Sequence, residues 1–129
     1  MESAVVQTAE GWELDVERGP DWLIVRPHDM PDAESESPQL AHHIWALLEQ
    51  NFTHRLLLEL DQIGYMRSYL IGQLVWLYKR IHNHGGVMRI CGLSEDNQAV
   101  LRQCRLEGRF PPYISREEAV MGSRPGQPR

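Results

Sequence analysis

The stretch IGYMRSYLIGQL, residues 63–74, joins an apolar, strand-like run to a long amphipathic helix. The run before it, RLLLEL at residues 55–60, is short and apolar enough for a buried strand. From Ser68 onward, apolar residues recur at helical spacing until Gly85 and Gly86, and glycine commonly ends a helix. A turn from a strand into a helix is a natural place for a phosphate group or a partner contact. This stretch is therefore the first candidate for function.

On both sides of this stretch, the sequence predicts a mixed α/β domain. Alternating apolar and polar residues predict strands at 12–17 and 22–26, joined as a hairpin. Ser37 and Pro38 suit the start of a helix whose apolar face extends to Phe52. The other predicted elements are a strand at 87–91, a helix from Ser94, a short extended piece at 111–114 and a helix from Ser115. The order predicts a four- to five-stranded, mostly parallel sheet that begins with an antiparallel hairpin and carries about four helices.

Length, charge and hydropathy limit the classes of function. The 129 residues suit one domain, which we expect to span residues 1–122, with a disordered tail at 123–129. The net charge of −5 argues against nucleic acid as the main partner, because phosphate binding needs a basic surface. No run of about 18 apolar residues predicts a membrane span. The acidic start lacks a signal-peptide layout, so a cytoplasmic protein is expected.

The sequence offers little for catalysis or metal binding. It contains no G-x-S-x-G, Walker-type or G-x-G-x-x-G motif, so we do not expect an enzyme. His42 and His43 are adjacent on a predicted helix and point about 100° apart, which is unsuited to sharing one ion. No metal or other cofactor is predicted. Cys91, in a strand, and Cys104, on an apolar helix face, are expected to be free, buried and inert thiols.

Arg67 and Ser68 open the predicted helix, and each has two interpretations. Ser68 is a weak candidate for phosphorylation, but the favoured interpretation is that its side chain caps the helix. Arg67, together with Ser68 and the helix amides, could hold an anion. The favoured interpretation of Arg67 is an exposed loop cation without a ligand.

The same helix carries aromatic residues outside its main apolar face. Its periodicity predicts that Tyr69, Gly72, Trp76 and either Lys79 or Arg80 gather on the opposite side. A Trp and a Tyr that flank a Gly resemble the centre of a protein interface. Equally, Trp76 could pack against the third helix or the tail as ordinary core.

These patterns resemble the STAS family, which comprises anti-sigma-factor antagonists and related domains, over about residues 12–121. The resemblance rests on the strand end at 57–61, the turn at 65–72, Gly85 and Gly86, the strand at 87–91, residues 100–106 and the closing segment 110–119. Family members carry a D-S-S-G-L-like or D-S-T-G-L-like turn. At its first four positions this chain has Arg67, Ser68, Tyr69 and Leu70. Tyr69 stands at the hydroxyl that family members phosphorylate, so the resemblance implies a switch that is lost or relocated.

The resemblance implies a non-enzymatic protein–protein interaction module in a bacterial partner-switching pathway. Its partner would be an anti-sigma factor or a related kinase-like protein. The partner-binding residues implied are Arg67, Ser68, Tyr69, Gly72, Trp76 and Arg80. The alternative is a small-ligand sensor or an accessory module linked to lipid transport, with an anion at Arg67 and Ser68. A homodimer that uses the same patch is a third interpretation.

Overall fold

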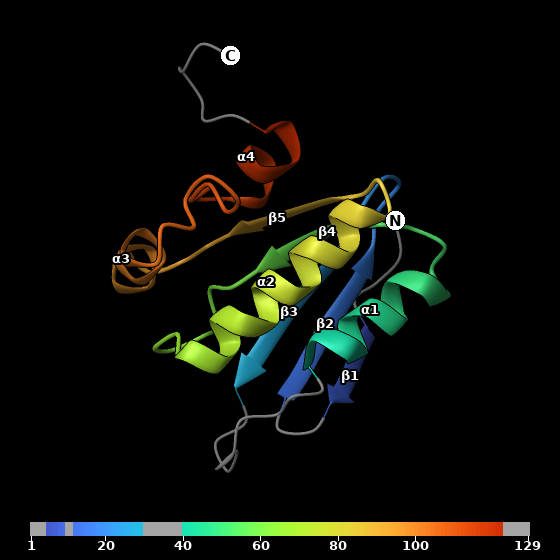
Figure 1. Cartoon of the computed structure of the whole chain (residues 1–129). Helices are drawn as coiled ribbons and strands as arrows, with labels where there is room; N and C mark the ends of the chain where they lie inside the picture. The colour runs from blue at the N-terminus through green and yellow to red at the C-terminus, as the bar shows by residue number, and fades with distance from the viewer. Residues whose placement is uncertain (1–4, 10–11, 30–39, 123–129) are drawn as a thin grey trace.

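The protein is built on a five-stranded sheet with the order β1-β2-β3-β4-β5 (Figure 1). The computed structural model describes residues 5–9, 12–29 and 40–122. The elements are β1 (Val5–Ala9), β2 (Trp12–Arg18), β3 (Leu23–Asp29), α1 (Leu40–Gln50), β4 (Arg55–Glu59), α2 (Ser68–Asn83), β5 (Val87–Cys91), α3 (Glu95–Gln103) and α4 (Arg116–Met121). β1, β2 and β3 pair antiparallel, whereas β3, β4 and β5 pair parallel. The parallel half follows from the crossover helices α1 and α2.

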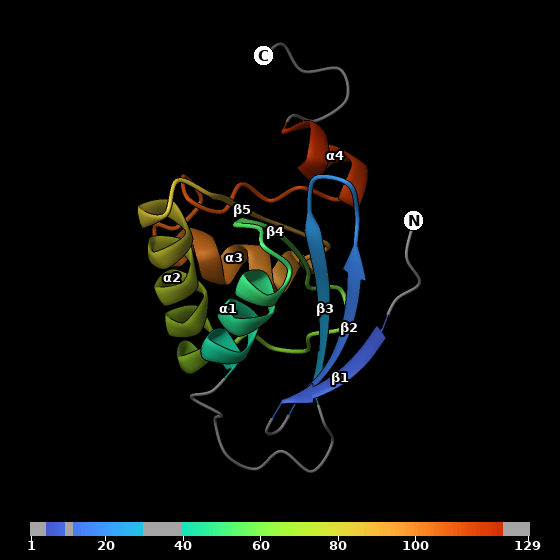
Figure 2. The same ribbon diagram turned by 90° about the vertical axis from the view of Figure 1, so that its right-hand side faces the viewer.

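The two faces of the sheet are covered by different helices. Successive side chains of a strand point to opposite faces, and β4 shows this directly. Leu56 and Leu58 join the core beneath α1 and α2, while Leu57 packs with Ala119 of α4 on the other face. Figure 2 shows α1 and α2 side by side along one face. The predicted mixed sheet with a hairpin and four helices is confirmed. The sheet is not mostly parallel, because β1 adds a second antiparallel pair to the two parallel ones.

An ion-pair network ties α4 to the second face of the sheet. Glu59, at the end of β4, is only 8% exposed. Arg116 donates to both of its carboxylate oxygens, at 2.8 and 3.2 Å, and also pairs with Glu17 at 3.1 Å. A bidentate arginine is the partner that a buried carboxylate needs. These contacts fix the start of α4, and its own first turn is capped by Ser115, as predicted.

The connection from α2 to β5 needs glycine at two positions, for two different reasons. Gly85 has φ +74°, which lies in the left-handed region, and a Cβ on Gly86 would lie 2.0 Å from the carbonyl oxygen of His54. The amide of Val87 donates to that same carbonyl at 2.9 Å. The prediction that the two glycines end the helix is therefore confirmed, and Gly86 is required by the close approach of β5 to residue 54.

The fifth strand lies elsewhere than the sequence suggested. The extended piece expected at 111–114 makes only an isolated bridge, from Tyr113 to Cys91, so it does not supply a strand of the sheet. Pro111 and Pro112 lack the amide donors that a ladder needs. The fifth strand is β1 at the other edge of the sheet, where it pairs with β2.

Two predictions of burial are also wrong. Phe52 does not extend the apolar face of α1, because that helix ends at Gln50 and Phe52 sits in a tight turn with φ 54° and 92% exposure. Cys104 is exposed, because α3 ends one residue earlier and its buried side carries Asn97 and Leu101. Ser37, Pro38 and the tail at 123–129 lie outside the described residues.

The two thiols are expected to differ sharply in reactivity. Burial, followed by the nearby carboxylates of Glu59 and Asp61, raises the pKa of Cys91 to about 12. At pH 8 only about one such thiol in ten thousand is ionised, and the thiolate is the reactive form. Ellman's reagent should therefore modify exposed Cys104 in the native protein and Cys91 only after unfolding. The Cys104→Ser variant should lose the native reaction, and equal labelling of both thiols before unfolding would contradict this assignment.

Candidate partner-binding surface at the start of helix α2

The loop between β4 and α2 is pinned to the core at three points. Leu60, Ile63 and Met66 are each buried, with at most 7% exposure. The amide of Leu60 also donates to the carbonyl of Cys91 at 2.9 Å, which extends the pairing of β4 with β5. The residues between these anchors are exposed, and Tyr65 stands out with 71% exposure. The loop thus presents a fixed set of side chains to solvent.

Asn97 of α3 holds this loop from inside. Its side chain is fully buried, and its Nδ2 donates to the carbonyl of Gly64 at 2.6 Å. Its Oδ1 accepts from the amide of Met66 at 2.8 Å. One amide side chain therefore satisfies a donor and an acceptor of a loop that cannot form secondary structure of its own. Sequence patterns indicate only a helix start around Ser94, so this role of Asn97 was not predicted.

The first turn of α2 lacks the predicted side-chain cap. The N-cap residue is Arg67, in extended conformation, and its side chain makes no capping hydrogen bond. Ser68 is the first helical residue, so the favoured interpretation of Ser68 as the cap is wrong. Arg67 and Ser68 are adjacent and exposed. Asp61, an acid earlier in the same loop, is paired with Arg26 at 3.1 Å.

Helix α2 is divided lengthwise into a buried strip, two flanks and an exposed strip. The buried strip consists of Leu70, Leu74, Leu77 and Ile81. The exposed strip, opposite to it at 100° per residue, contains Ser68, Gly72 and Lys79. A Cβ on Gly72 would meet nothing within 4 Å. This exposed strip continues the exposed surface of Arg67 and Tyr65 along the helix.

Trp76 belongs to the flank that faces α1. Its ring stacks on His42 with centroids 4.3 Å apart, and the guanidinium of Arg80 lies 5.4 Å from the Trp76 ring and 5.0 Å from the ring of Trp45. Tyr69 and Trp76 are half-buried and pack against the core. The predicted placement of these rings opposite the apolar face is therefore wrong, and so is the third helix as the neighbour of Trp76. The physical reason is that α1 lies close enough to cover this flank.

The six predicted partner-binding residues thus divide into two groups. Arg67, Ser68 and Gly72 lie on the exposed surface at the start of α2, whereas Tyr69, Trp76 and Arg80 follow the seam with α1. Tyr65, which was not among the predicted binding residues, joins the first group. Within residues 5–9, 12–29 and 40–122, no three His, Cys, Asp or Glu side chains are arranged to hold a metal ion. No helix of that part is long and apolar enough to cross a bilayer.

Comparison with known proteins gives one family. The family model described as STAS domain matches residues 13–119. An anti-sigma factor antagonist from Mycobacterium paratuberculosis has a TM-score of 0.70 at 16% identity, covering 89% of this chain and 96% of that one. An anti-sigma-factor antagonist (STAS) domain protein from Planctomyces limnophilus has a TM-score of 0.68 at 23% identity, and the match covers 84% of this chain and 96% of that one. A putative anti-sigma factor antagonist from Thermotoga maritima has a TM-score of 0.65 at 21% identity, and the match covers 84% of this chain and 92% of that one. These structures are similar in fold.

Removing the Asn97 side-chain amide should loosen the start of α2. In Asn97→Ala, the carbonyl of Gly64 and the amide of Met66 lose a buried partner, which should lower the free energy of unfolding by about 2–3 kcal/mol. Urea denaturation measures this loss, and hydrogen exchange should show faster exchange at Met66. Gln103→Ala, an exposed change in the same helix, is the control. Unchanged exchange at Met66 would show that Asn97 does not hold the loop.

Proposed function

The chain belongs to the STAS domain family, and we propose that it acts by binding a protein through the exposed start of α2. In this proposal it is a non-enzymatic module, similar to an anti-sigma-factor antagonist, in a partner-switching pathway of the bacterial cytoplasm. The partner is an anti-sigma factor or a related kinase-like protein. The observation that carries the proposal is a rigidly anchored turn whose side chains Tyr65, Arg67 and Ser68 nevertheless face solvent.

Gly72 supports this location. Glycine inside a helix costs about 1 kcal/mol relative to alanine, and nothing within the described monomer requires a glycine there, since a Cβ would meet only open space. Glycine at an exposed helical position allows another backbone to approach closely. A partner that packs across the first two turns of α2 would explain this choice. Arg67 in the place of the family's acid then favours an acidic contact on the partner.

The side chains around the turn also support the loss of the phosphorylation switch. Tyr69, which stands where family members carry the phosphorylated hydroxyl, is half-buried against the core. Leu70, which stands at the glycine position, is 3% exposed and fills the core beneath α2. Both substitutions are thus integrated into the packing of the monomer. In this proposal the surface binds constitutively, without removal of a phosphate group.

Blocking the exposed strip should abolish capture of the partner. Gly72→Arg fits the space at residue 72 and improves helix propensity, so the fold should persist while a bulky cation occupies the interface. We expect affinity capture from the native cell to recover an anti-sigma factor or a kinase-like ATPase with the wild-type chain and to lose it with Gly72→Arg. Gln50→Arg, at the far end of α1 (Figure 1), carries the same charge and should retain capture. Equal capture by all three chains would place the interface elsewhere.

Ser68 should remain unphosphorylated by the partner kinase. Ser68 precedes the family's phosphorylated position by one residue, and one helical step turns its side chain by about 100°. Incubation with the partner kinase and ATP should leave the mass of the wild-type protein unchanged by mass spectrometry. Tyr69→Ser, which returns a hydroxyl to that position, should gain one phosphate group and so serves as the positive control. Phosphate on Ser68 in protein isolated from cells would contradict the loss of the switch.

A further inference from the structure

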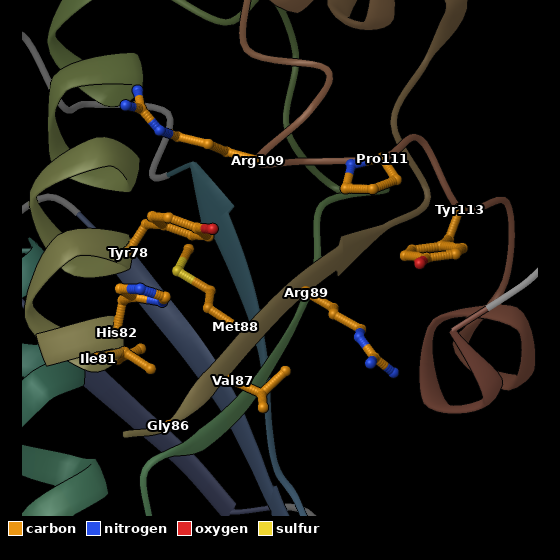
Figure 3. Close-up of a pocket in the computed structure, with 10 residues that line it drawn as sticks. All are labelled: Tyr78, Ile81, His82, Gly86, Val87, Met88, Arg89, Arg109, Pro111 and Tyr113. Atoms are coloured by element: carbon orange, nitrogen blue, oxygen red, sulfur yellow. The ribbon is translucent and has the colours of Figure 1, made fainter. Parts of the chain in front are cut away.

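The outer edge of β5 is covered along only part of its length. β5 is the last strand of the sheet, so no named strand lies beyond it. Near the end of β5, Tyr113 forms an isolated bridge with Cys91, and the amide of Gly92 donates to the Tyr113 carbonyl at 3.1 Å. Near its beginning, a cavity of about 260 Å³ borders residues 86–89 instead (Figure 3). Among the described residues, this first part of the edge therefore has no neighbouring strand.

Met88 directs its backbone N–H and C=O toward this cavity. The amide of Val87 donates to the carbonyl of His54, and the carbonyl of Cys91 accepts from the amide of Leu60, so residues 87 and 91 bond toward β4. Because successive residues of a strand bond toward opposite edges, the N–H and C=O of Met88 point away from β4. Met88 also belongs to the lining of the cavity. A donor and an acceptor at a free sheet edge are the groups that an added strand pairs with.

The cavity has one wall on each side of β5. On the first side, Tyr78 and His82 of α2 form the wall, with their rings parallel at 7° and their centroids 6.0 Å apart. On the other side, Tyr113 and Val87 pack against the smaller apolar cluster beneath α4. Figure 3 shows β5 running between Tyr78 and Tyr113. Since a strand sends alternate side chains to opposite faces, an added strand would place one side chain against α2 and the next against Tyr113.

Arg109 supplies a charge on the α2 side of this cavity. Figure 3 shows its side chain extending toward α2. The Arg109 side chain is exposed, and no carboxylate of the described residues lies within 4.0 Å of its guanidinium. Arg89, on the other side, is already occupied, because it donates to the carbonyls of Ala119 and Val120 at 2.8 and 3.2 Å. An acidic side chain is therefore favoured on the α2 side alone.

We propose that a short extended segment of a partner protein adds to the free edge of β5 at Met88. The segment runs antiparallel, because one residue opposite Met88 then bonds to both its N–H and its C=O. That residue is acidic and lies on the α2 side with Arg109, since paired residues point to the same face. Its two neighbours are apolar and lie toward Tyr113 and Val87. The proposed function at the start of α2 uses none of these residues.

The recessed position of the edge favours a single strand over a second copy of this chain. The open part of the edge lies between the α2 wall and the Tyr113 wall. A second copy carries the same two walls beside its own β5, and these walls would hold the two edges apart. A single extended segment has no such walls.

The probe for this site is the peptide Ac-Ser-Val-Glu-Val-Ser-NH2, titrated into the isolated full chain and followed by amide chemical shifts. We expect saturable shifts at Met88 and Tyr113, together with slower hydrogen exchange at the Met88 N–H. The same peptide with N-methylglutamate at its centre loses the backbone donor to the Met88 carbonyl. It should bind about tenfold more weakly or not at all.

The acidic side chain is tested with a second peptide and one protein variant. Replacing the central Glu of the peptide by Gln should weaken binding severalfold, and Arg109→Gln should weaken binding of the Glu peptide by a similar factor. The two changes together should cost little more than either one alone, because they remove the same ion pair. Arg102→Gln, which changes an exposed arginine outside the cavity, is the matched control and should bind both peptides as the wild type does.

Three results would overturn the proposal. The first is the absence of saturable shifts at Met88, and the second is equal binding of the N-methylated peptide, which would indicate contact without strand pairing. The third is a shift of the Met88 amide with protein concentration when no peptide is present, which would assign this edge to a second copy of the chain. Because the peptide is tested on the isolated chain, these outcomes are independent of whether the start of α2 binds a partner.

Discussion

The burial of β4 on both faces is the constraint on which the rest of the structure depends. Leu56, Leu57 and Leu58 are each at most 1% exposed, so neither face of this strand can be left to solvent. The α1–α2 pair covers one face and α4 the other. The strand then ends in Glu59, a buried carboxylate that requires Arg116 and so fixes where α4 begins. The loop from β4 to α2 follows Glu59, and the side chain of Asn97 holds this loop through its hydrogen bonds to Gly64 and Met66.

The division of α2 into strips explains how one helix can stabilise the fold and also present a surface. The buried strip and both flanks are committed to packing: one flank contacts α1 through Trp76, and the other contacts Phe110 through Tyr78 at 5.3 Å. Only the exposed strip with Ser68 and Gly72 is left over. In the proposed function, the partner contacts this narrow strip and the anchored turn that precedes it. A surface built this way gains affinity from preorganisation, since little conformational freedom is lost on binding.

Sequence patterns predicted the regular core well, because strand alternation and helix periodicity are local signals. They failed where a residue's surroundings depend on distant segments. Trp76 sits about 120° from the buried strip on an isolated helix, and only the proximity of α1 makes it half-buried. Asn97 appeared to be part of a helix start, because its hydrogen bonds reach residues more than thirty positions away. Phe52 and Cys104 were misjudged by one or two residues at helix ends, where periodicity stops carrying information.

The contact at Gly86 fixes the end of α2 relative to the sheet. Because the backbone there touches the carbonyl of His54 with no space for even a methyl group, the end of α2 is locked to the beginning of β4. The other end is held by the buried side chains of Met66 and Leu70 and by the two hydrogen bonds of Asn97. With both ends held, α2 keeps one position relative to the sheet. An approaching protein would therefore meet Ser68 and Gly72 at a fixed distance from the strands beneath them.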